Sequence, residues 1–591
     1  MALRACDFVT TLNATPNERI DDVMQQATPG THEQVDVLVV GSGASGGWAA
    51  KRLTEAGIRV TMLEAGRALS PGDYREHLAP YHLPYRNRAA AIVRATRPRQ
   101  SDCYALSEFN YEWFANDLDE PYTTPTGRPF SWQGRMRVVG GRTNVWGRQS
   151  YRFGPHDFQA ASLDGFGMDW PLAYEDLVPY YELVEDYVGI TGMVENDPML
   201  PDSRYHPPMG LTCAEVHVRG VLKQQFNRTL TQGRAANITR AQNGRQPCHY
   251  CGPCERGCVT RSYFNAANTT VADALATGRC TLIQNAMVYQ VLMDPDGRTA
   301  RGVTYIDRDT REVHEVRARV VVLAAQSLES VRILFNSRNR QYEGGLANSS
   351  GVLGKYLMDH TWVAGGASAE FPDHPGPLGI DGPNRPTGLY VVRFRNRPGE
   401  PAHKDFIRGY GYQGGGTTAH TLAFPGFGEA YKRAVVQQTG VTTVQFVGFG
   451  EVLPYEDNHV SIDPAVVDAW GIPVLRISMA WKENELKMIP DMGVAAAEML
   501  EAAGGRNVQP FQYIDRVPGF GIHEMGIARM GRDPKTSVLN QFQQTHDVPN
   551  LFVTDASCFV SGGCQNPTLT IMALTVRSMD YLMEQMKQGS V

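Results

Sequence analysis

The 591-residue sequence lacks long apolar segments, a strong excess of one charge and any evident internal repeat. No stretch approaches the ~18 consecutive apolar residues that a membrane-spanning helix needs. The first thirty residues lack the basic head and apolar core of a secretory signal. Acids and bases are interspersed at a net charge of −6, without a basic stripe, which argues against nucleic-acid binding. We expect no transmembrane segment and no export signal in this chain.

Cysteine is scarce, with ten residues, and six of them are scattered without the paired spacing of a disulfide framework. We therefore expect a chain that folds in a reducing compartment, with most of these six as ordinary buried thiols. The length exceeds that of one ordinary domain and fits a large two-domain enzyme. The scattered residues are Cys6, Cys103, Cys213, Cys280, Cys558 and Cys564.

The other four cysteines crowd into one short segment, at Cys248, Cys251, Cys254 and Cys258. Glycine and proline residues between them allow the backbone to fold around a common centre, as in iron–sulfur and zinc sites. Zinc ligands usually come as two separated pairs, whereas gaps of two, two and three residues are closer to ferredoxin spacing. The segment favours an iron–sulfur cluster, and a structural zinc site is the alternative.

A strand, a glycine-rich turn and a helix are predicted near the beginning of the chain. The apolar run Val35–Val40 leads into Gly41, Gly43 and Gly46, the GxGxxG pattern of dinucleotide sites. The first glycine allows a tight turn, the second lets the backbone approach a pyrophosphate, and the third lets the helix pack closely. A second strand ends at Glu64, whose carboxylate can bind ribose hydroxyls. The pattern predicts a dinucleotide site but does not distinguish flavin from nicotinamide.

Later motifs make that distinction. They lie at Val138–Gly147, Gly351–His360, Asn550–Ser557 and Asn566–Thr570. From about residue 33 to the C-terminus the chain resembles the glucose-methanol-choline (GMC) oxidoreductases. The resemblance implies an α/β fold, with a Rossmann-like FAD-binding domain and an inserted α+β substrate domain built on an antiparallel sheet.

Within this family the cysteine segment is similar to that of bacterial iron–sulfur sugar dehydrogenases, namely the flavin subunits of glucose, gluconate and glucoside 3-dehydrogenases. Pyranose oxidase is a more distant likeness. In the glucose dehydrogenase subunits, three cysteines separated by five and three residues ligate a [3Fe-4S] cluster, and Cys248, Cys254 and Cys258 reproduce this spacing. The resemblance favours [3Fe-4S]. Cys251 is then a bystander, or a fourth ligand that would make the cluster [4Fe-4S].

The resemblance also implies the catalytic pair His523 and Asn566. An imidazole with a pKa near neutrality suits a general base. The asparagine can donate a hydrogen bond to the substrate oxygen, and its alternative role is that of a turn residue before proline. Non-covalent FAD is expected, because Val145 stands where pyranose oxidase has its flavin-attaching histidine. Further cofactor contacts are expected at Gly140, Gly141, Asn144 and Asp555.

The motifs predict a discontinuous FAD-binding domain. The pattern of Trp481–Ala503 is typical of an amphipathic helix, whereas the glycine run Gly414–Gly416 is expected to form a loop. The predicted parts are 31–240, 266–355 and 511–591 for the FAD-binding domain, 241–265 for the iron–sulfur loop and 356–510 for the substrate domain.

The predicted enzyme is an FAD-dependent sugar dehydrogenase that oxidises a secondary hydroxyl of a pyranose, with carbon 3 of glucose or a glucoside as the first choice. Electrons would leave through the cluster to a cytochrome c-type partner. The alternatives are a carbon 1 aldose or gluconate dehydrogenase, a pyranose oxidase-like enzyme, a lyase with structural flavin, and a non-catalytic electron-transfer subunit. The family relation also implies a small subunit with a twin-arginine signal. It implies a periplasmic, membrane-associated location reached as a passenger, with the cytoplasm as the alternative.

Overall fold

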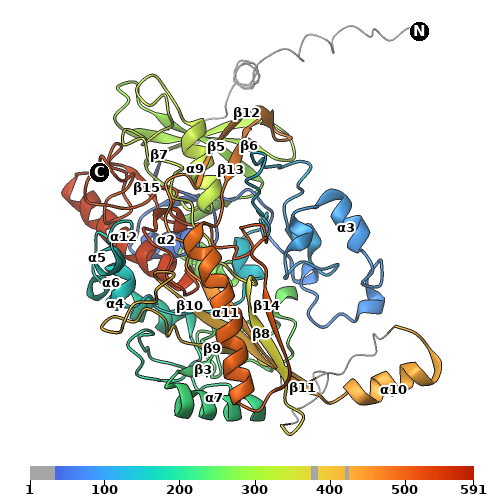
Figure 1. Cartoon of the computed structure of the whole chain (residues 1–591). Coiled ribbons are helices and arrows are strands. Elements are labelled where there is room, and N and C mark those ends of the chain that lie inside the picture. Colours follow the sequence, from blue (N-terminus) through green and yellow to red (C-terminus); the bar gives the residue numbers. More distant parts are fainter. Residues whose placement is uncertain (1–33, 375–383, 419–424) are drawn as a thin grey trace.

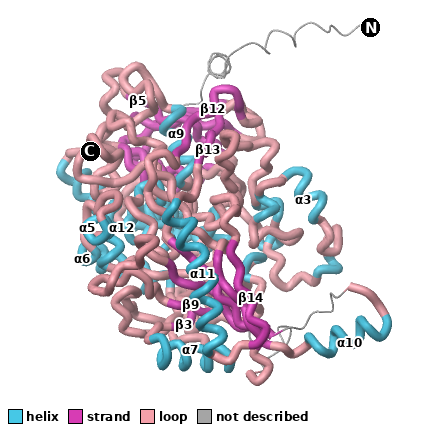
Figure 2. Tube along the Cα trace, in the orientation of Figure 1, coloured by secondary structure: helices cyan, strands magenta, loops and turns pink. Residues whose placement is uncertain are grey.

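The computed structural model describes residues 34–374, 384–418 and 425–591. Cys6 and the segment searched for a signal lie outside these ranges. Within them, no helix is both long enough and apolar enough to cross a bilayer. The strands gather in two main groups, one in the upper and one in the lower half of Figure 2.

The larger sheet has seven strands among the described residues. Six lie in the order β4 (Cys280–Ile283), β2 (Val60–Leu63), β1 (Val35–Val40), β7 (Val313–Leu323), β6 (Ala300–Asp307) and β5 (Ala286–Met293), and β15 (Leu551–Val553) pairs with β7. Strands β4, β2, β1, β7 and β15 pair in parallel, whereas β5, β6 and β7 form an antiparallel meander. The central strand β1 is mostly apolar because both faces of a parallel sheet are covered.

Helices cover this sheet, as Figure 1 shows around β7 and β15. Helix α2 (Ala44–Glu55) packs against α8 (Thr270–Ala276) and the C-terminal α12 (Thr568–Gln588), which in turn packs on α6 (Tyr174–Val188). Helix α9 (Ser327–Asn336) contacts β5 and a separate two-stranded sheet. That sheet consists of β12 (His459–Val467) and β13 (Pro473–Ser478). The α/β class predicted for the FAD-binding part is confirmed.

The second large sheet is antiparallel throughout. Its order is β14 (Arg506–Gln512), β8 (Gly365–Glu370), β11 (Thr442–Gly450), β10 (Tyr410–Thr418), β9 (Leu389–Val391) and β3 (Leu230–Gln232). The predicted helix is found as α11 (Glu483–Ala502), which crosses the sheet with Met488, Met492 and Met499 buried. Strand β3 and the adjoining helix α7 (Cys213–Phe226) belong to this layer although they precede residue 240. The substrate layer therefore draws on a segment outside 356–510.

The loop expected at Gly414–Gly416 is wrong, because these glycines lie within β10. Two strands approach there more closely than a side chain allows. A Cβ atom on Gly388 would lie 1.5 Å from the carbonyl oxygen of Gly414, and one on Gly414 would lie 1.8 Å from that of Gln445. The glycines serve close strand packing, a role that a glycine-rich segment does not reveal in sequence.

We predict that Gly388→Ala destabilises the protein by about 1–3 kcal/mol, because its methyl group forces β9 and β10 apart. The midpoint of chemical denaturation measures this. The matched control is Gly220→Ala on the exposed face of α7, where a Cβ would meet nothing within 4 Å. That change should be neutral or stabilise the helix by up to ~1 kcal/mol. Equal midpoints for the two variants would contradict the packing argument.

Candidate active site

A cavity opens at the edge where the parallel strands end. Gly41 follows β1, Glu64 follows β2, Ala324 follows β7 and Asp555 lies just after β15, and all four line this cavity of about 500 Å³. Because parallel strands end together at one edge, residues far apart in the chain meet there. Hydrogen bonds hold the edge in register, including Gly41 N to Leu63 O at 2.8 Å.

The glycine turn has the shape that a dinucleotide needs. Gly41 has φ +98°, and a Cβ there would lie 2.4 Å from the carbonyl oxygen of Ala324. A Cβ on Gly46 would lie 1.9 Å from Gly41 O, whereas one on Gly43 would meet nothing within 4 Å. Gly43 also caps the N-terminus of α2, where backbone N–H groups attract phosphate. Gly41 and Gly43 line the cavity, while Gly46 holds the helix against the turn.

The carboxylate of Glu64 organises the neighbouring backbone. It accepts hydrogen bonds from Ser42 N at 3.1 Å, Ser42 Oγ at 2.6 Å and Gly66 N at 2.8 Å. Burial raises the pKa of this carboxyl group. Asp555 is similarly buried, accepts from Ser557 N at 3.0 Å and also has a raised pKa because of burial. Both acids therefore lie at the cavity wall in positions that suit hydroxyl groups of a nucleotide.

The loop after Val138 approaches the glycine turn, but its three predicted cofactor contacts do not all line the cavity. Gly141 lines the cavity, and its Cβ would lie 3.6 Å from Gly43 Cα, whereas Gly140 and Asn144 are not among the lining residues. The Asn144 amide donates to Val139 O at 3.0 Å and to Gly141 O at 2.9 Å. The Asn144 side chain thus holds the loop in shape, and its contact with a cofactor stays a prediction. The cradle as a whole fits FAD, and Val145 at the wall offers no atom for a covalent link.

Glu524 and Arg142 connect this loop to the histidine segment. The Arg142 guanidinium donates to the two Glu524 oxygens at 2.7 and 3.0 Å, and to Ile522 O at 3.1 Å. Although burial opposes it, Arg142 lowers the pKa of Glu524. This ion pair holds residues 522–524 against the cavity.

His523 lies half-buried at the cavity wall. The buried carboxylate of Asp359 accepts from His523 N and from Gly521 N, both at 3.0 Å. Burial and the nearby charge of Glu524 raise the pKa of Asp359 to about 7. Burial, with smaller effects from His360 and Arg142, lowers the pKa of His523 well below its usual value. The His523 imidazole is therefore neutral near pH 7, as a general base must be.

Three more side chains that sequence reasoning missed lie in or directly behind this wall. His360 Nδ1 lies 3.1 Å from His523 Nδ1, and the Phe449 ring packs 5.5 Å from the His523 ring. Gln413 Nε2 donates to Asn566 Oδ1 at 2.6 Å, and both of these residues line the cavity with His523. His360 ends a motif already noted in the sequence, and only its role was unassigned. Nothing in the sequence marked Gln413 or Phe449.

The cysteine segment borders the same cavity. Glu255, next to Cys254, lines the cavity and pairs with Arg148 at 3.5 Å. Cys254 is buried, Cys248 is partly buried, and Val259 beyond the segment is 65% exposed. The segment therefore extends from the cavity wall to the surface. All nine described cysteines are free, and Cys213 is exposed rather than buried.

Backbone N–H groups point at the sulfur atoms of this segment. Tyr250 N donates to Cys248 Sγ at 3.4 Å, and Ser262 N donates to Cys258 Sγ at 3.2 Å. Such hydrogen bonds are typical of thiolates that hold iron–sulfur clusters. Sulfur atoms around one zinc ion would lie about 3.8 Å apart. Among the described residues no three of these sulfurs lie within 4.8 Å of one another, and the choice between an iron–sulfur cluster and zinc stays a prediction.

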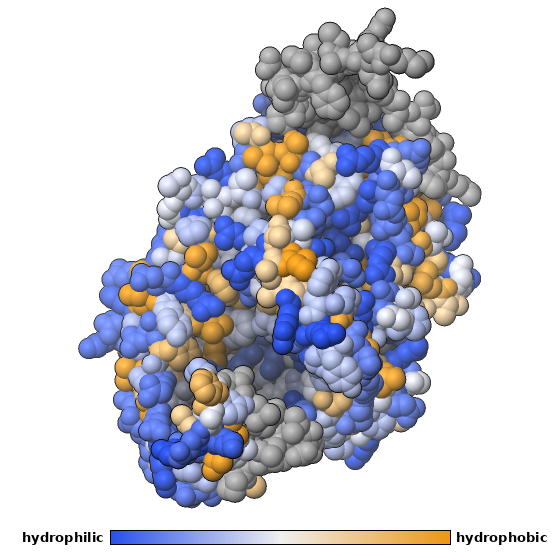
Figure 3. Space-filling model, turned by 90° about the vertical axis from the view of Figure 1, so that its right-hand side faces the viewer, coloured by the Kyte–Doolittle hydropathy of each residue, from blue (hydrophilic) through white to orange (hydrophobic). Residues whose placement is uncertain are grey.

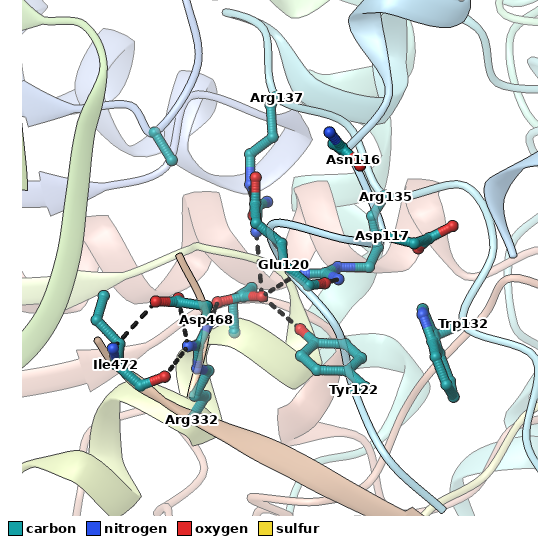
Figure 4. Close-up of polar contacts among 12 residues, drawn as sticks. Asn116, Asp117, Glu120, Tyr122, Trp132, Arg135, Arg137, Arg332, Asp468 and Ile472 are labelled. Carbon is teal, nitrogen blue, oxygen red and sulfur yellow. Dashed lines mark hydrogen bonds and ion pairs between the residues drawn. The ribbon is translucent and has the colours of Figure 1, made fainter. Parts of the chain in front are cut away.

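A cluster of buried charges adjoins the cavity, and Figure 4 shows its polar contacts. Arg135, Arg137 and Glu329 belong both to this cluster and to the cavity wall. Neighbouring guanidinium groups outweigh burial and lower the pKa of Glu329. The network joins α9 to the loop around residue 120 and to the β12–β13 turn. Its ion pairs are Arg137–Glu120 at 2.6 Å, Arg135–Glu329 at 2.9 Å and Arg332–Asp468 at 2.6 Å.

The surface turned toward the viewer in Figure 3 is hollowed in its lower half. Hydrophilic residues dominate this face, and apolar residues are scattered among them.

The comparison with known proteins agrees with this geometry. The family description "GMC oxidoreductase" matches residues 35–362 and 454–575. The chain is 32% identical to 2-methyl-1,2-propanediol dehydrogenase of Mycolicibacterium austroafricanum, covering 93% of this chain and 95% of that protein. It is 26% identical to the fructose dehydrogenase large subunit of Gluconobacter japonicus, covering 94% and 98%.

Among solved structures, pyridoxine 4-oxidase from Mesorbium loti superposes with a TM-score of 0.59 at 18% identity, covering 93% of this chain and 99% of that one. This likeness concerns the fold. Together with the FAD-shaped cradle and the His523 wall, the matches show that the chain belongs to the GMC oxidoreductase family and is an FAD-dependent oxidoreductase of CH–OH groups.

Proposed function

We propose that the protein is a sugar dehydrogenase that oxidises a secondary hydroxyl of a pyranose, with carbon 3 of glucose or a glucoside as the first candidate. The observation that carries the proposal is the wall on which His523 and Asn566 face one cavity with the glycine cradle. A base and a hydrogen-bond donor beside a flavin site are what alcohol oxidation requires. The likeness to a fructose dehydrogenase subunit supports a sugar as substrate.

His523 and Asn566 have different roles in the proposed reaction. His523 removes the hydroxyl proton, and the negative charge that develops on the substrate oxygen needs a donor. Gln413 occupies Asn566 Oδ1, so the Asn566 amide presents its N–H group to that oxygen. When bound, FAD accepts the carbinol hydrogen as hydride. Asn566 therefore acts as donor and His523 as base, and neither competes for the other's role.

The cysteine segment supports a second part of the proposal, an iron–sulfur cluster held by Cys248, Cys254 and Cys258, with Cys251 as a bystander or a fourth ligand. Such a cluster accepts electrons one at a time. The segment joins the cavity wall to the surface, where a partner can dock. We further propose a cytochrome c-type acceptor, a small subunit carrying a twin-arginine signal and a periplasmic, membrane-associated location.

A second candidate substrate is a small vicinal diol. The 32% identity to a 2-methyl-1,2-propanediol dehydrogenase over nearly the whole chain favours it. The same base and donor would serve that reaction, but the hydroxyl oxidised would be the primary one, because the other carbinol carbon of 2-methyl-1,2-propanediol carries no hydrogen.

We predict that anaerobic glucose or a methyl glucoside bleaches the flavin bands of the purified protein over a broad iron–sulfur background. The visible absorption spectrum before and after addition measures this. 2-Methyl-1,2-propanediol is tested in parallel. Bleaching by the diol alone would replace the sugar assignment, and a missing background would remove the cluster from the proposal.

We predict that His523→Ala lowers the rate constant of flavin reduction by about two to four decades, because the base is lost. FAD should remain bound, since His523 is not part of the glycine cradle. Stopped-flow absorbance measures the rate, and exposed His82 provides the control variant His82→Ala. A wild-type rate in His523→Ala would disprove the base assignment.

We predict that Cys254→Ser removes the cluster absorbance and blocks electron transfer to a cytochrome, while substrate still reduces the flavin. Cys213→Ser, on an exposed thiol outside the segment, should change neither property. Cys251→Ser decides the ligand number, because a three-iron cluster survives it. If Cys254→Ser also abolished flavin reduction, the segment would be structural.

A further inference from the structure

His360 is a buried histidine that takes no direct part in the proposed proton and hydride transfers. It lies beside Asp359 and His523, and one ligand-type atom from each of the three falls within 4.8 Å of the others. These atoms already have partners without an ion. Asp359 accepts from two backbone N–H groups, and the two imidazoles contact each other through Nδ1. The arrangement is a hydrogen-bonded chain of rings rather than a metal site.

The contact between His360 and Gly563, at one end of this hydrogen-bonded series, determines where the hydrogen atoms of the two rings lie. His360 Nε2 is 3.1 Å from the carbonyl oxygen of Gly563, which can only accept a hydrogen bond. Nε2 of His360 must therefore carry a hydrogen. Burial lowers the pKa of His360 to about 3, so the ring is neutral and carries only that one hydrogen. Nδ1 of His360 is left as an acceptor.

The same reasoning applies to the ring of His523. The contact of 3.1 Å between the two Nδ1 atoms needs one donor, and His360 cannot supply it. His523 must donate from its own Nδ1. A neutral imidazole has one N–H group, so His523 Nε2 then has the free lone pair. The ring of Phe449 packs on both imidazoles, 4.5 Å from His360 and 5.5 Å from His523, and holds them in place.

We propose that His360 is a positioning residue that fixes the tautomer of His523, so that Nε2 of His523 is the atom that removes the substrate's hydroxyl proton. In that step the O–H bond breaks, its electron pair stays on oxygen, and the Nε2 lone pair forms the new N–H bond. The inference rests on the proposed role of His523 as base. It does not depend on which alcohol is the substrate.

The side chain that contacts the His523 ring is a neutral imidazole, which distinguishes this pair from a serine-protease triad. In a serine-protease triad a carboxylate contacts the base and stabilises its protonated form. Here the carboxylate of Asp359 binds the backbone of His523, and a neutral imidazole contacts the ring. A neutral acceptor orients the base and stabilises its protonated form less than a carboxylate would. Because burial lowers the pKa of His523, this ring remains unprotonated below the usual pKa of a histidine.

Two substitutions of His360 separate its two hydrogen bonds. His360→Asn places an amide oxygen near the position of Nδ1 and keeps an acceptor for His523. His360→Gln places its amide near the position of Nε2, so it can still donate to Gly563 O but no longer accepts from His523. We expect the asparagine variant to reduce its flavin within about 5-fold of the wild-type rate, since a wrong tautomer is the costly defect.

We expect His360→Gln to lower the rate constant of flavin reduction by about 10- to 10³-fold, less than the ~10⁴-fold cost of a wrong tautomer in a catalytic triad. FAD content and the substrate concentration at half-maximal rate should not change, because His360 touches neither ligand site directly. A general loss of structure would instead affect both variants and both of these readouts. A wild-type rate in His360→Gln would overturn the proposal.

A substrate-free measurement completes the test. ¹⁵N-histidine labelling of the FAD-loaded wild-type protein should show Nδ1 of His523 protonated and Nε2 unprotonated, with the signals assigned by their loss in His523→Ala. A hydrogen on Nε2 would overturn the proposal even if both His360 variants failed to fold. If no sugar reduces the flavin, the sugar assignment fails, whereas the nitrogen spectrum still decides the role of His360.

Discussion

The shared carboxyl edge of the parallel strands is the constraint on which the site depends. Strand β1 lies between β2 and β7, and β15 adds to β7, so turns separated by about five hundred residues open into one cavity. The contact between Gly41 and Ala324 is too close for any side chain at Gly41. A change there would move the cradle and the strand edge together, because both are built from the same backbone.

The wall around His523 is held in place in a different way, by buried polar groups that bind the backbone. Asp359 binds two N–H groups of the histidine segment, and Arg142 binds Glu524 beside it. A buried charge is costly unless it is paired or hydrogen-bonded, so each of these groups tolerates little displacement. The histidine pair extends the same principle from the backbone to a side chain, where it selects a tautomer.

Sequence reasoning succeeded where a local pattern has one physical meaning. The GxGxxG turn, the acid at Glu64 and helix α11 follow from spacing and periodicity. It failed where the role of a residue depends on a partner that lies far away in the sequence. The glycines of β10 looked like a loop because only the close approach of the Gly388 backbone explains them.

The sequence by itself determined the family, the dinucleotide turn and the local crowding of four cysteines. Each of these depends on motifs whose residues lie close together in the sequence. Tertiary structure alone decided that Gln413 orients Asn566, that His360 contacts His523, and that the cysteine segment borders the cavity. Those relations join positions that are tens to hundreds of residues apart. Hydrogen bonding and close packing select such partners only after the strands and helices have brought them within reach.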